Sequence, residues 1–335
     1  MPDARVRLAL LGCGGFSAGN IQPVLEATGL FDIVACYDPA TEAAEAAARR
    51  FGGRPCRSFL EAVSAEGVEA VAVLGPNDVH REQTVAALGA GRHVFVEKPM
   101  ANTVADGMAM VRAAEAAGRT LMVGHVTRRI VPFRLARDAV RSGRLGRVLS
   151  AEAHFSHGGG KTLPPDAWRA DPARCPGLPL NVIGCHLTDV LNMLLGRPRV
   201  VAALHRRALV PTNDDVTATL IGYDAPVVAT LVSHYAAPVV HELRVVGTEG
   251  VVEVHEHGLA FTYRGATGGV TERQEFRDRR TLAEEWEEFA RAVRHGGEVE
   301  TDGRGGVYAV AVTEASVLSA REGRLVHLGE LLGDF

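Results

Sequence analysis

The first 125 residues alternate short apolar runs with alanine-rich stretches that favour helix. The run Val6–Leu11 has no polar residue beyond Arg7, which is typical of a strand that is buried on both faces. Four similar runs follow it, at residues 31–38, 68–75, 93–98 and 120–125. Strands and helices that alternate in this way form a parallel sheet with helices on both faces. We therefore expect residues 1–125 to form a doubly wound α/β domain.

The pattern changes from about Arg147, where strand-like runs follow one another with few helices between them. Such a series predicts a large, mainly antiparallel sheet with one covered face and one free face. A few helical stretches complete this second α/β domain, which we place at residues 126–335. One glycine- and proline-rich segment, 156–179, shows no periodicity, and a loop of this length in a compact domain is usually functional or disordered.

Length and composition exclude several classes of protein. The 335 residues correspond to two domains, at roughly 150 residues each. A content of 47% hydrophobic and 23% charged residues argues against a disordered chain, and a net charge of −4 argues against a nucleic-acid-binding protein. No apolar run approaches the ~18 residues of a membrane span, and the short run after Arg5 and Arg7 resembles a strand more than a signal peptide. The five cysteines include no C-x-x-C pair, which argues against a disulfide framework and favours a cytoplasmic protein.

A glycine-rich sequence, Gly12-x-Gly14-x-x-Ser17, directly follows the first strand. In a turn of this kind the first glycine permits the tight bend and the second lets the backbone approach a pyrophosphate. The helix that follows presents unpaired N–H groups to the anion. We assign Gly12, Gly14, Gly15, Phe16 and Ser17 to cofactor binding, with slightly looser helix packing at Ser17, where the motif has a third glycine.

Asp38 ends the second predicted strand, 21 residues after Ser17. This is close to the spacing of about 20 residues expected for the acid that binds the adenosine ribose of a dinucleotide. A carboxylate there accepts hydrogen bonds from the ribose hydroxyls and repels a 2′-phosphate. The sequence therefore predicts NAD as the cofactor in preference to NADP.

Two further motifs stand at the ends of predicted strands, GPNDVH at Gly75–His80 and EKPM at Glu97–Met100. Together with the glycine motif they resemble the Gfo/Idh/MocA oxidoreductases, the group of glucose–fructose oxidoreductase and inositol dehydrogenase. The resemblance continues through VGH, GRLGRV, WRADP, GCHLTD, NDDVTATL and VVGTEG, which begin at Val123, Gly143, Trp168, Gly184, Asn213 and Val245. It implies a Rossmann domain, a second domain with a large open-faced sheet, a nicotinamide cofactor and a polyol or sugar substrate.

The resemblance also implies two catalytic residues, Lys98 of the EKP motif and His186 of the G-x-H-x-x-D motif. An ammonium group beside a substrate oxygen stabilises a developing alkoxide, and an imidazole can accept the hydroxyl proton. On residue type alone, a lysine at a strand end is a solvated charge and a histidine on a helix is a core residue. The motif context is what favours the catalytic interpretation.

The chain departs from the family four residues before His186, where many members have a carboxylate and this chain has Val182. Asn181 lies five residues before the histidine, about 140° around an α-helix, so on that geometry it does not replace the acid. Asp189 lies three residues after His186 and either orients the imidazole or makes a structural hydrogen bond. We expect His186 to be less basic without the acid.

Several other residues complete the expected site. The cofactor set also includes Pro76, Asn77, His80, Glu97, Lys98, Trp168 and Arg169. The substrate set contains Lys98, Arg128, His154, His186 and Tyr235. Trp168 has the alternative role of a packing residue. Arg128 and its neighbour Arg129 either meet an acidic group of the substrate or are surface charges.

A metal centre is the competing chemistry, because Glu253, His255 and His257 alternate along one predicted strand and so share a face. Three residues on a single strand rarely close a tetrahedral shell, and we expect no metal.

The sequence thus predicts an NAD-dependent dehydrogenase acting on a sugar, an inositol or a related molecule. Two alternatives remain: an NAD-assisted elimination or hydrolysis without net redox change, and a non-catalytic NAD-binding regulatory protein, which Val182 favours. The free face of the second sheet predicts a homodimer or homotetramer, with no nucleic acid or membrane partner.

Overall fold

The computed structural model describes residues 4–277 and 280–335, which divide into two compact units. The first unit contains the described residues up to Ala101, then Ala105–His125 and Arg280–Val307. The second contains Asn102–Val104, the described residues from Val126 to 277, and Tyr308–Phe335. A division of the sequence at residue 125 places 280–307 with the second half, whereas in space this segment belongs to the first unit.

The first unit is built on a parallel sheet of six strands in the order β3-β2-β1-β4-β5-β6. The order reverses direction at β1, as in a doubly wound Rossmann fold, and confirms the prediction. The strands are β1 (Val6–Leu11), β2 (Phe31–Tyr37), β3 (Arg54–Pro55), β4 (Ala70–Val73), β5 (His93–Val96) and β6 (Leu121–Val123).

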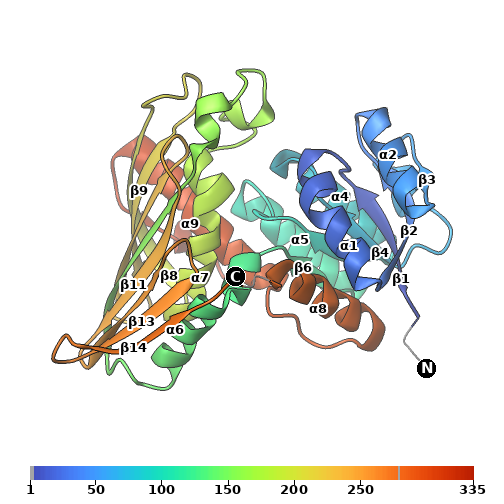
Figure 1. The fold of residues 1–335 in the computed structure, drawn as a ribbon. Helices are drawn as coiled ribbons and strands as arrows, with labels where there is room; N and C mark the ends of the chain where they lie inside the picture. Colours follow the sequence, from blue (N-terminus) through green and yellow to red (C-terminus); the bar gives the residue numbers. More distant parts are fainter. Residues whose placement is uncertain (1–3, 278–279) are drawn as a thin grey trace. The chain divides into compact units, whose positions relative to one another are not determined.

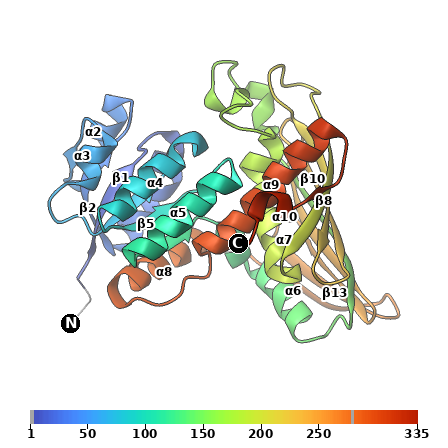
Figure 2. The ribbon, with the colours of Figure 1, turned by 180° about the vertical axis from the view of Figure 1, so that it is seen from behind.

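Helices cover both faces of this sheet: α1 (Gln22–Thr28), α2 (Thr41–Phe51), α3 (Phe59–Val63), α4 (His80–Gly89), α5 (Val104–Ala117) and α8 (Thr281–His295). Helices α1 and α8 lie in front of the sheet in Figure 1, and α4 and α5 lie in front of it in Figure 2. The fully buried Trp286 of α8 stacks on Phe95 with ring centroids 4.2 Å apart and meets Phe31 edge-on at 5.5 Å. Helix α8 therefore completes the core of the first unit, although it lies far from that unit in the sequence.

The second unit is built on a sheet of nine strands in the order β14-β13-β12-β11-β7-β10-β9-β8-β15. All neighbours are antiparallel except β7 and β10, which confirms the mainly antiparallel prediction. The strands are β7 (Val148–Ser156), β8 (Pro198–Arg206), β9 (Val216–Tyr223), β10 (Val228–His234), β11 (Val240–Gly247), β12 (Gly250–His255), β13 (Ala260–Gly265), β14 (Val270–Glu275) and β15 (Val326–His327).

Three helices, α6 (Val131–Arg141), α7 (Cys185–Leu195) and α9 (Gly303–Glu322), pack on one face of this sheet (Figure 1). A further short helix, α10 (Gly329–Leu332), follows β15. Burial alternates along the strands: Ala229 and Leu231 are buried against the helices, whereas Thr230 and Val228 are exposed on the other side. The sheet is therefore open-faced, as expected from the pattern of the sequence.

Short helical turns carry parts of several predicted motifs. They are η1 (Ser17–Ile21), η2 (Asn77–Val79), η3 (Val126–Arg129), η4 (Gly158–Thr162), η5 (Trp168–Ala170) and η6 (Leu180–Gly184). Two of them, η1 and η6, are π-helical and run directly into α1 and α7. Throughout residues 4–277 and 280–335, no helix is both long enough and apolar enough to cross a membrane.

Candidate functional site

The glycine loop after β1 is fixed by a close backbone contact. Gly12 has φ +102°, and a Cβ atom added there would lie 2.7 Å from the backbone nitrogen of Gly75. Only glycine can bring the first and fourth strands so close at this point. An added Cβ on Gly15, in contrast, would meet no atom within 4 Å. The loop is thus closely packed behind Gly12 and open at Gly15, as a cradle for a dinucleotide requires.

Asp38 lies directly beside this loop. Its Oδ2 accepts a hydrogen bond from the Cys13 backbone N–H at 2.7 Å, and its Oδ1 accepts one from the Ala40 N–H at 2.9 Å. These bonds hold the carboxylate in one orientation at the carboxyl ends of β1 and β2, where ligands of such sheets bind. The residues present therefore fit a dinucleotide.

Ser17 turns its side chain inward from the π-turn η1. It is 2% exposed, and its Oγ lies 3.5 Å from the Nε2 of Gln22, which also lies 3.4 Å from the Cys13 carbonyl oxygen. Phe16, the preceding residue, is 45% exposed. The serine thus packs into the interior while the phenylalanine is left at the surface of the loop.

His80 connects the two motifs that follow β4 and β5. Its ring is fully buried, with Nδ1 3.0 Å from the Pro99 carbonyl oxygen and Nε2 2.9 Å from that of Gly75. Burial lowers the pKa of this imidazole, because desolvation penalises its charged form. The structure therefore places His80 as a tie between the Gly75–His80 segment and the Lys98–Pro99 peptide, with Asn77 also buried in this segment.

Glu97 is a buried carboxyl group next to the predicted catalytic lysine. Its side chain is 7% exposed, and its Oε2 accepts a hydrogen bond from the Lys98 backbone N–H at 3.1 Å. Desolvation raises the pKa of Glu97 to about 6, against the smaller opposing effects of the Lys98 charge and N–H. Lys98 itself is half-buried at the carboxyl end of β5.

In the second unit, His186 is the second residue of α7 and is half-buried, with its ring 6.0 Å from that of Phe155. The π-turn η6 immediately precedes it and changes the expected register. In a turn with i→i+5 hydrogen bonds, residues five apart lie one turn apart, as residues four apart do in an α-helix. The expectation that Asn181 points about 140° away from His186 assumed a regular α-helix, whereas Asn181 lies in the π-turn η6 and His186 in α7.

Asn181 and Val182 have different surroundings. Asn181 is 1% exposed and its Nδ2 donates to Oδ1 of Asn102 at 3.2 Å. Val182 packs against a small apolar cluster, which we call the loop cluster and which consists of Cys175, Leu178, Ile183, Val210 and Tyr235. The polar side of η6 is thus provided by the asparagine rather than by the residue four before His186.

Arg128 and Asp189 form an ion pair between η3 and α7. The Arg128 Nε lies 2.7 Å from Asp189 Oδ2, and its second terminal nitrogen bonds to Oδ1. Their side chains are only 12% and 2% exposed. The pair gives Asp189 a structural role. It also engages the Arg128 guanidinium, which was expected from the sequence to meet an acidic group of the substrate.

His154 lies on the open face of the sheet, whereas its neighbour Phe155 faces His186 on the helix-covered side. There the His154 Nε2 is 3.2 Å from Nδ1 of His234, beside a hollow of about 650 Å³. Burial and the neighbouring His234 both lower the pKa of His154. The structure thus does not bring His154 and His186 together.

Tyr235 and Trp168 meet in the loop cluster. Tyr235 is 7% exposed and belongs to the cluster, and Trp168 packs against it. The Arg169 guanidinium lies 4.3 Å over the Trp168 ring. Tyr235 is therefore placed as a packing residue, and desolvation raises the pKa of its hydroxyl.

The strand residues weighed as a metal site have other partners. Glu253 bonds to Arg244 at 2.9 Å and to Arg264 at 2.9 Å, and His255 Nε2 lies 2.9 Å from the Thr262 hydroxyl. Among the residues that the structure describes, no group of three His, Cys, Asp or Glu side chains is arranged to hold a metal ion.

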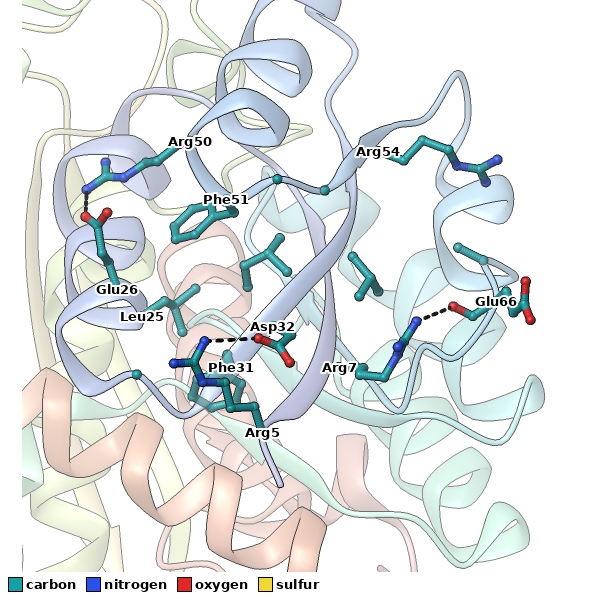
Figure 3. Close-up of a pocket in the computed structure, with 16 residues that line it drawn as sticks. Arg5, Arg7, Leu25, Glu26, Phe31, Asp32, Arg50, Phe51, Arg54 and Glu66 are labelled. Atoms are coloured by element: carbon teal, nitrogen blue, oxygen red, sulfur yellow. Dashed lines mark hydrogen bonds and ion pairs between the residues drawn. The ribbon is translucent and has the colours of Figure 1, made fainter. Parts of the chain in front are cut away.

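A hollow of about 850 Å³ opens at the other end of β1 and β2, away from the glycine loop (Figure 3). Its basic side chains are already engaged: Arg5 with Asp32 at 3.2 Å, Arg50 with Glu26 at 2.7 Å, and Arg7 with the Gly67 carbonyl at 2.9 Å. Helices α1 and α2 also end here, and their carbonyl ends disfavour anions. The glycine loop, rather than this hollow, is therefore the candidate cofactor site.

Comparison with known proteins supports this assignment. Residues 6–125 match the oxidoreductase family with an NAD-binding Rossmann fold, and residues 133–253 match the Gfo/Idh/MocA C-terminal domain. The chain is 30% identical to D-apiose dehydrogenase of Paraburkholderia graminis, over 98% of this chain and 91% of that protein. It is 28% identical to D-xylose 1-dehydrogenase (NADP⁺) 2 of Haloferax volcanii, over 95% and 98% of the two chains. Among solved structures, aldose–aldose oxidoreductase of Caulobacter crescentus complexed with glycerol superposes with a TM-score of 0.86 at 27% identity, over 96% and 99% of the two chains.

Proposed function

Because the chain belongs to the Gfo/Idh/MocA oxidoreductase family, we propose that it is an NAD-dependent dehydrogenase of a sugar, an inositol or a related polyol. The observation that carries the NAD preference is the orientation of Asp38, whose carboxylate is held beside the glycine loop by two backbone N–H groups. A fixed negative charge there accepts ribose hydroxyls and repels the extra phosphate of NADP. One relative is named for NADP⁺, so cofactor choice varies within the family.

The cofactor is proposed to bind along Gly12–Ser17 and Asp38, with the GPNDVH segment and Glu97 next to it. Backbone N–H groups at the start of the helix favour its pyrophosphate. When bound, the nicotinamide supplies a hydride acceptor or donor. His80 is proposed to act indirectly, since its ring is enclosed by two carbonyl oxygens and holds the lysine-bearing turn.

Lys98 and His186 are proposed as the catalytic residues, in the roles that the motifs imply. The Lys98 ammonium stabilises negative charge on the substrate oxygen, and the His186 imidazole accepts the hydroxyl proton. Asn181 is proposed to supply a polar group near His186, in place of the acid that the family resemblance leads us to expect there. Its position in the π-turn η6, which is not a regular α-helix, supports this proposal.

The substrate class is tested with purified protein, NAD and a panel of aldoses, polyols and inositols, followed by NADH absorbance. Accumulation of NADH with at least one of them supports the dehydrogenase. Conversion of a sugar without net NADH supports elimination or hydrolysis instead. NADH binding without any turnover across the panel supports a regulatory protein.

We also propose a cytoplasmic homo-oligomer that pairs through the open sheet face. Exposed apolar side chains on this face support the pairing, among them Leu204 at 62% and Leu220 at 45%. All five cysteines are buried and none forms a disulfide, which supports a reducing compartment. Light scattering that gives the mass of a monomer at micromolar concentration would contradict the pairing.

A further inference from the structure

The segment that carries Trp168 and Arg169 is held by a buried asparagine far away in the sequence. Asn213 is 1% exposed, and its Nδ2 donates hydrogen bonds to two carbonyl oxygens of that segment, Arg169 at 3.1 Å and Cys175 at 2.8 Å. Its Oδ1 accepts the Asp214 backbone N–H at 2.8 Å. Both donor hydrogens and the acceptor of this carboxamide are therefore used.

Asn213 is itself fixed by its neighbours. The Asp215 carboxylate accepts three backbone N–H groups, those of Ala208 at 2.6 Å, Leu209 at 2.6 Å and Val210 at 2.9 Å. Asp214 lies 3.4 Å from Nδ1 of the buried His205, so it adds a contact on the strand side. The turn before β9 is thus a rigid base from which the asparagine reaches the loop.

A second amide holds the same segment. Asn102 donates from Nδ2 to the Arg174 carbonyl oxygen at 2.8 Å, next to the carbonyl of Cys175 that Asn213 holds. Three anchor points, at residues 169, 174 and 175, therefore fix a loop that has no strand of its own between β7 and η6. The side chains that project from it, Trp168 and Arg169, are stacked on one another.

We infer that Asn213 is a positioning residue: its carboxamide fixes the Trp168–Arg169 pair in the geometry that ligand binding needs. This inference rests on the proposed function together with the cofactor-binding role that the sequence predicts for Trp168 and Arg169. A carboxamide of this length is required, because a carboxylate has no hydrogens to donate and would face two carbonyl oxygens.

The inference is tested with Asn213→Asp, which keeps the shape, and Asn213→Ser, which avoids a buried charge if the first variant does not fold. Thr219→Val is the matched control, since it removes a buried hydroxyl bond to Ser316 in the same unit without touching the loop. Tryptophan emission reports the loop directly, because the chain has two tryptophans and Trp286 is in the core of the first unit. We expect either Asn213 variant to shift emission to longer wavelength and to increase acrylamide quenching several-fold, and both changes to vanish in a Trp168→Phe background.

The second readout is the Kd for NADH, measured by NADH fluorescence. We expect about a tenfold weaker Kd for the Asn213 variants, no change for Thr219→Val, and no further loss when Asn213→Ser is added to Trp168→Ala/Arg169→Ala. A loss of affinity that persists in that background, or unchanged Trp168 emission, would overturn the inference. If the unmodified protein binds no NADH, the proposed function fails, whereas the emission measurements still decide whether Asn213 fixes the loop.

Discussion

The Arg128 guanidinium binds both carboxylate oxygens of Asp189, which joins η3 to α7 through an ion pair that is almost fully buried. Removing one partner of such a pair leaves an uncompensated charge in the interior, whereas apolar residues in both positions are often tolerated. The pair is thus a sensitive point of the second unit, one turn of helix after His186.

We predict that Arg128→Met lowers the free energy of unfolding by about 3–5 kcal/mol, as is usual when one member of a buried ion pair is removed. The double variant Arg128→Met/Asp189→Leu should recover most of this loss, because no charge is left behind. Urea denaturation followed by circular dichroism measures both. A double variant as unstable as the single one would show that the guanidinium is held mainly by other contacts.

The glycine loop provides a matched pair of substitutions. Gly12→Ala combines a φ of +102° with a Cβ atom 2.7 Å from backbone, whereas Gly15→Ala meets no atom within 4 Å. We expect Gly12→Ala to cost at least about 1–3 kcal/mol in backbone strain and to abolish NADH binding. Gly15→Ala should retain the unfolding temperature of the original protein. Equal unfolding temperatures for the two variants in a thermal melt would contradict the close packing behind Gly12.

Glu97 predicts a pH dependence of stability. Its pKa is raised from 4.5 to about 6 by burial, so the folded state holds a proton that the unfolded state has already lost between these values. The contribution of Glu97 to the free energy of unfolding therefore falls as pH rises from about 4.5 to 6, by about 2 kcal/mol for a shift of 1.5 pKa units. Above pH 6 this contribution is constant. Glu97→Gln removes this contribution. The free energy of unfolding of Glu97→Gln minus that of the original protein should therefore increase over this pH range. Urea denaturation at pH 4, 5, 6 and 7 measures this difference, and a difference independent of pH would contradict the assignment.

The sequence predicted the first unit well because its signals are local. The run Val6–Leu11, the glycine turn and the position of Asp38 depend on residues that are close together in the chain, and each is found where it was expected. Ser58 likewise caps α3 from the position just before it, since its Oγ accepts the Glu61 N–H at 3.1 Å. Patterns of this kind are set by strand and helix periodicity and by capping, which a single sequence displays.

The second unit was harder to predict because its site depends on contacts between distant residues. The π-turn before α7 adds one residue to a helical turn, and no residue type in Leu180–Gly184 marks it. Asn213 was part of a recognised motif, but its partners Arg169 and Cys175 lie about 40 residues earlier and become visible only in the fold. The face of His154 depends on strand register, which reverses with a shift of one residue.

The catalytic roles predict different results for two alanine variants. Lys98→Ala should abolish turnover and leave the Kd for NADH nearly unchanged, because the glycine loop does not depend on this side chain. His186→Ala should lower kcat by roughly 10²–10⁴-fold, the usual contribution of general acid–base catalysis. Both are measured on the substrate that the panel identifies. Full activity of His186→Ala would mean that another group carries the proton.

Cofactor preference tests the role of Asp38. Its two oxygens are held by the Cys13 and Ala40 N–H groups, so the charge remains beside the loop whichever cofactor approaches. Pro39 follows, and no arginine stands at 39 or 40 to receive a phosphate. We expect NADH to bind more tightly than NADPH, and Asp38→Ser/Pro39→Arg to narrow or reverse the ratio of the two Kd values, because the repulsion is removed and a cation is added. Asp38→Ser alone is the control: it should weaken NADH without a comparable gain for NADPH. If the unmodified protein binds NADPH at least as tightly as NADH in a fluorescence titration, Asp38 does not select the cofactor through the ribose, and the carboxylate serves only to hold the loop.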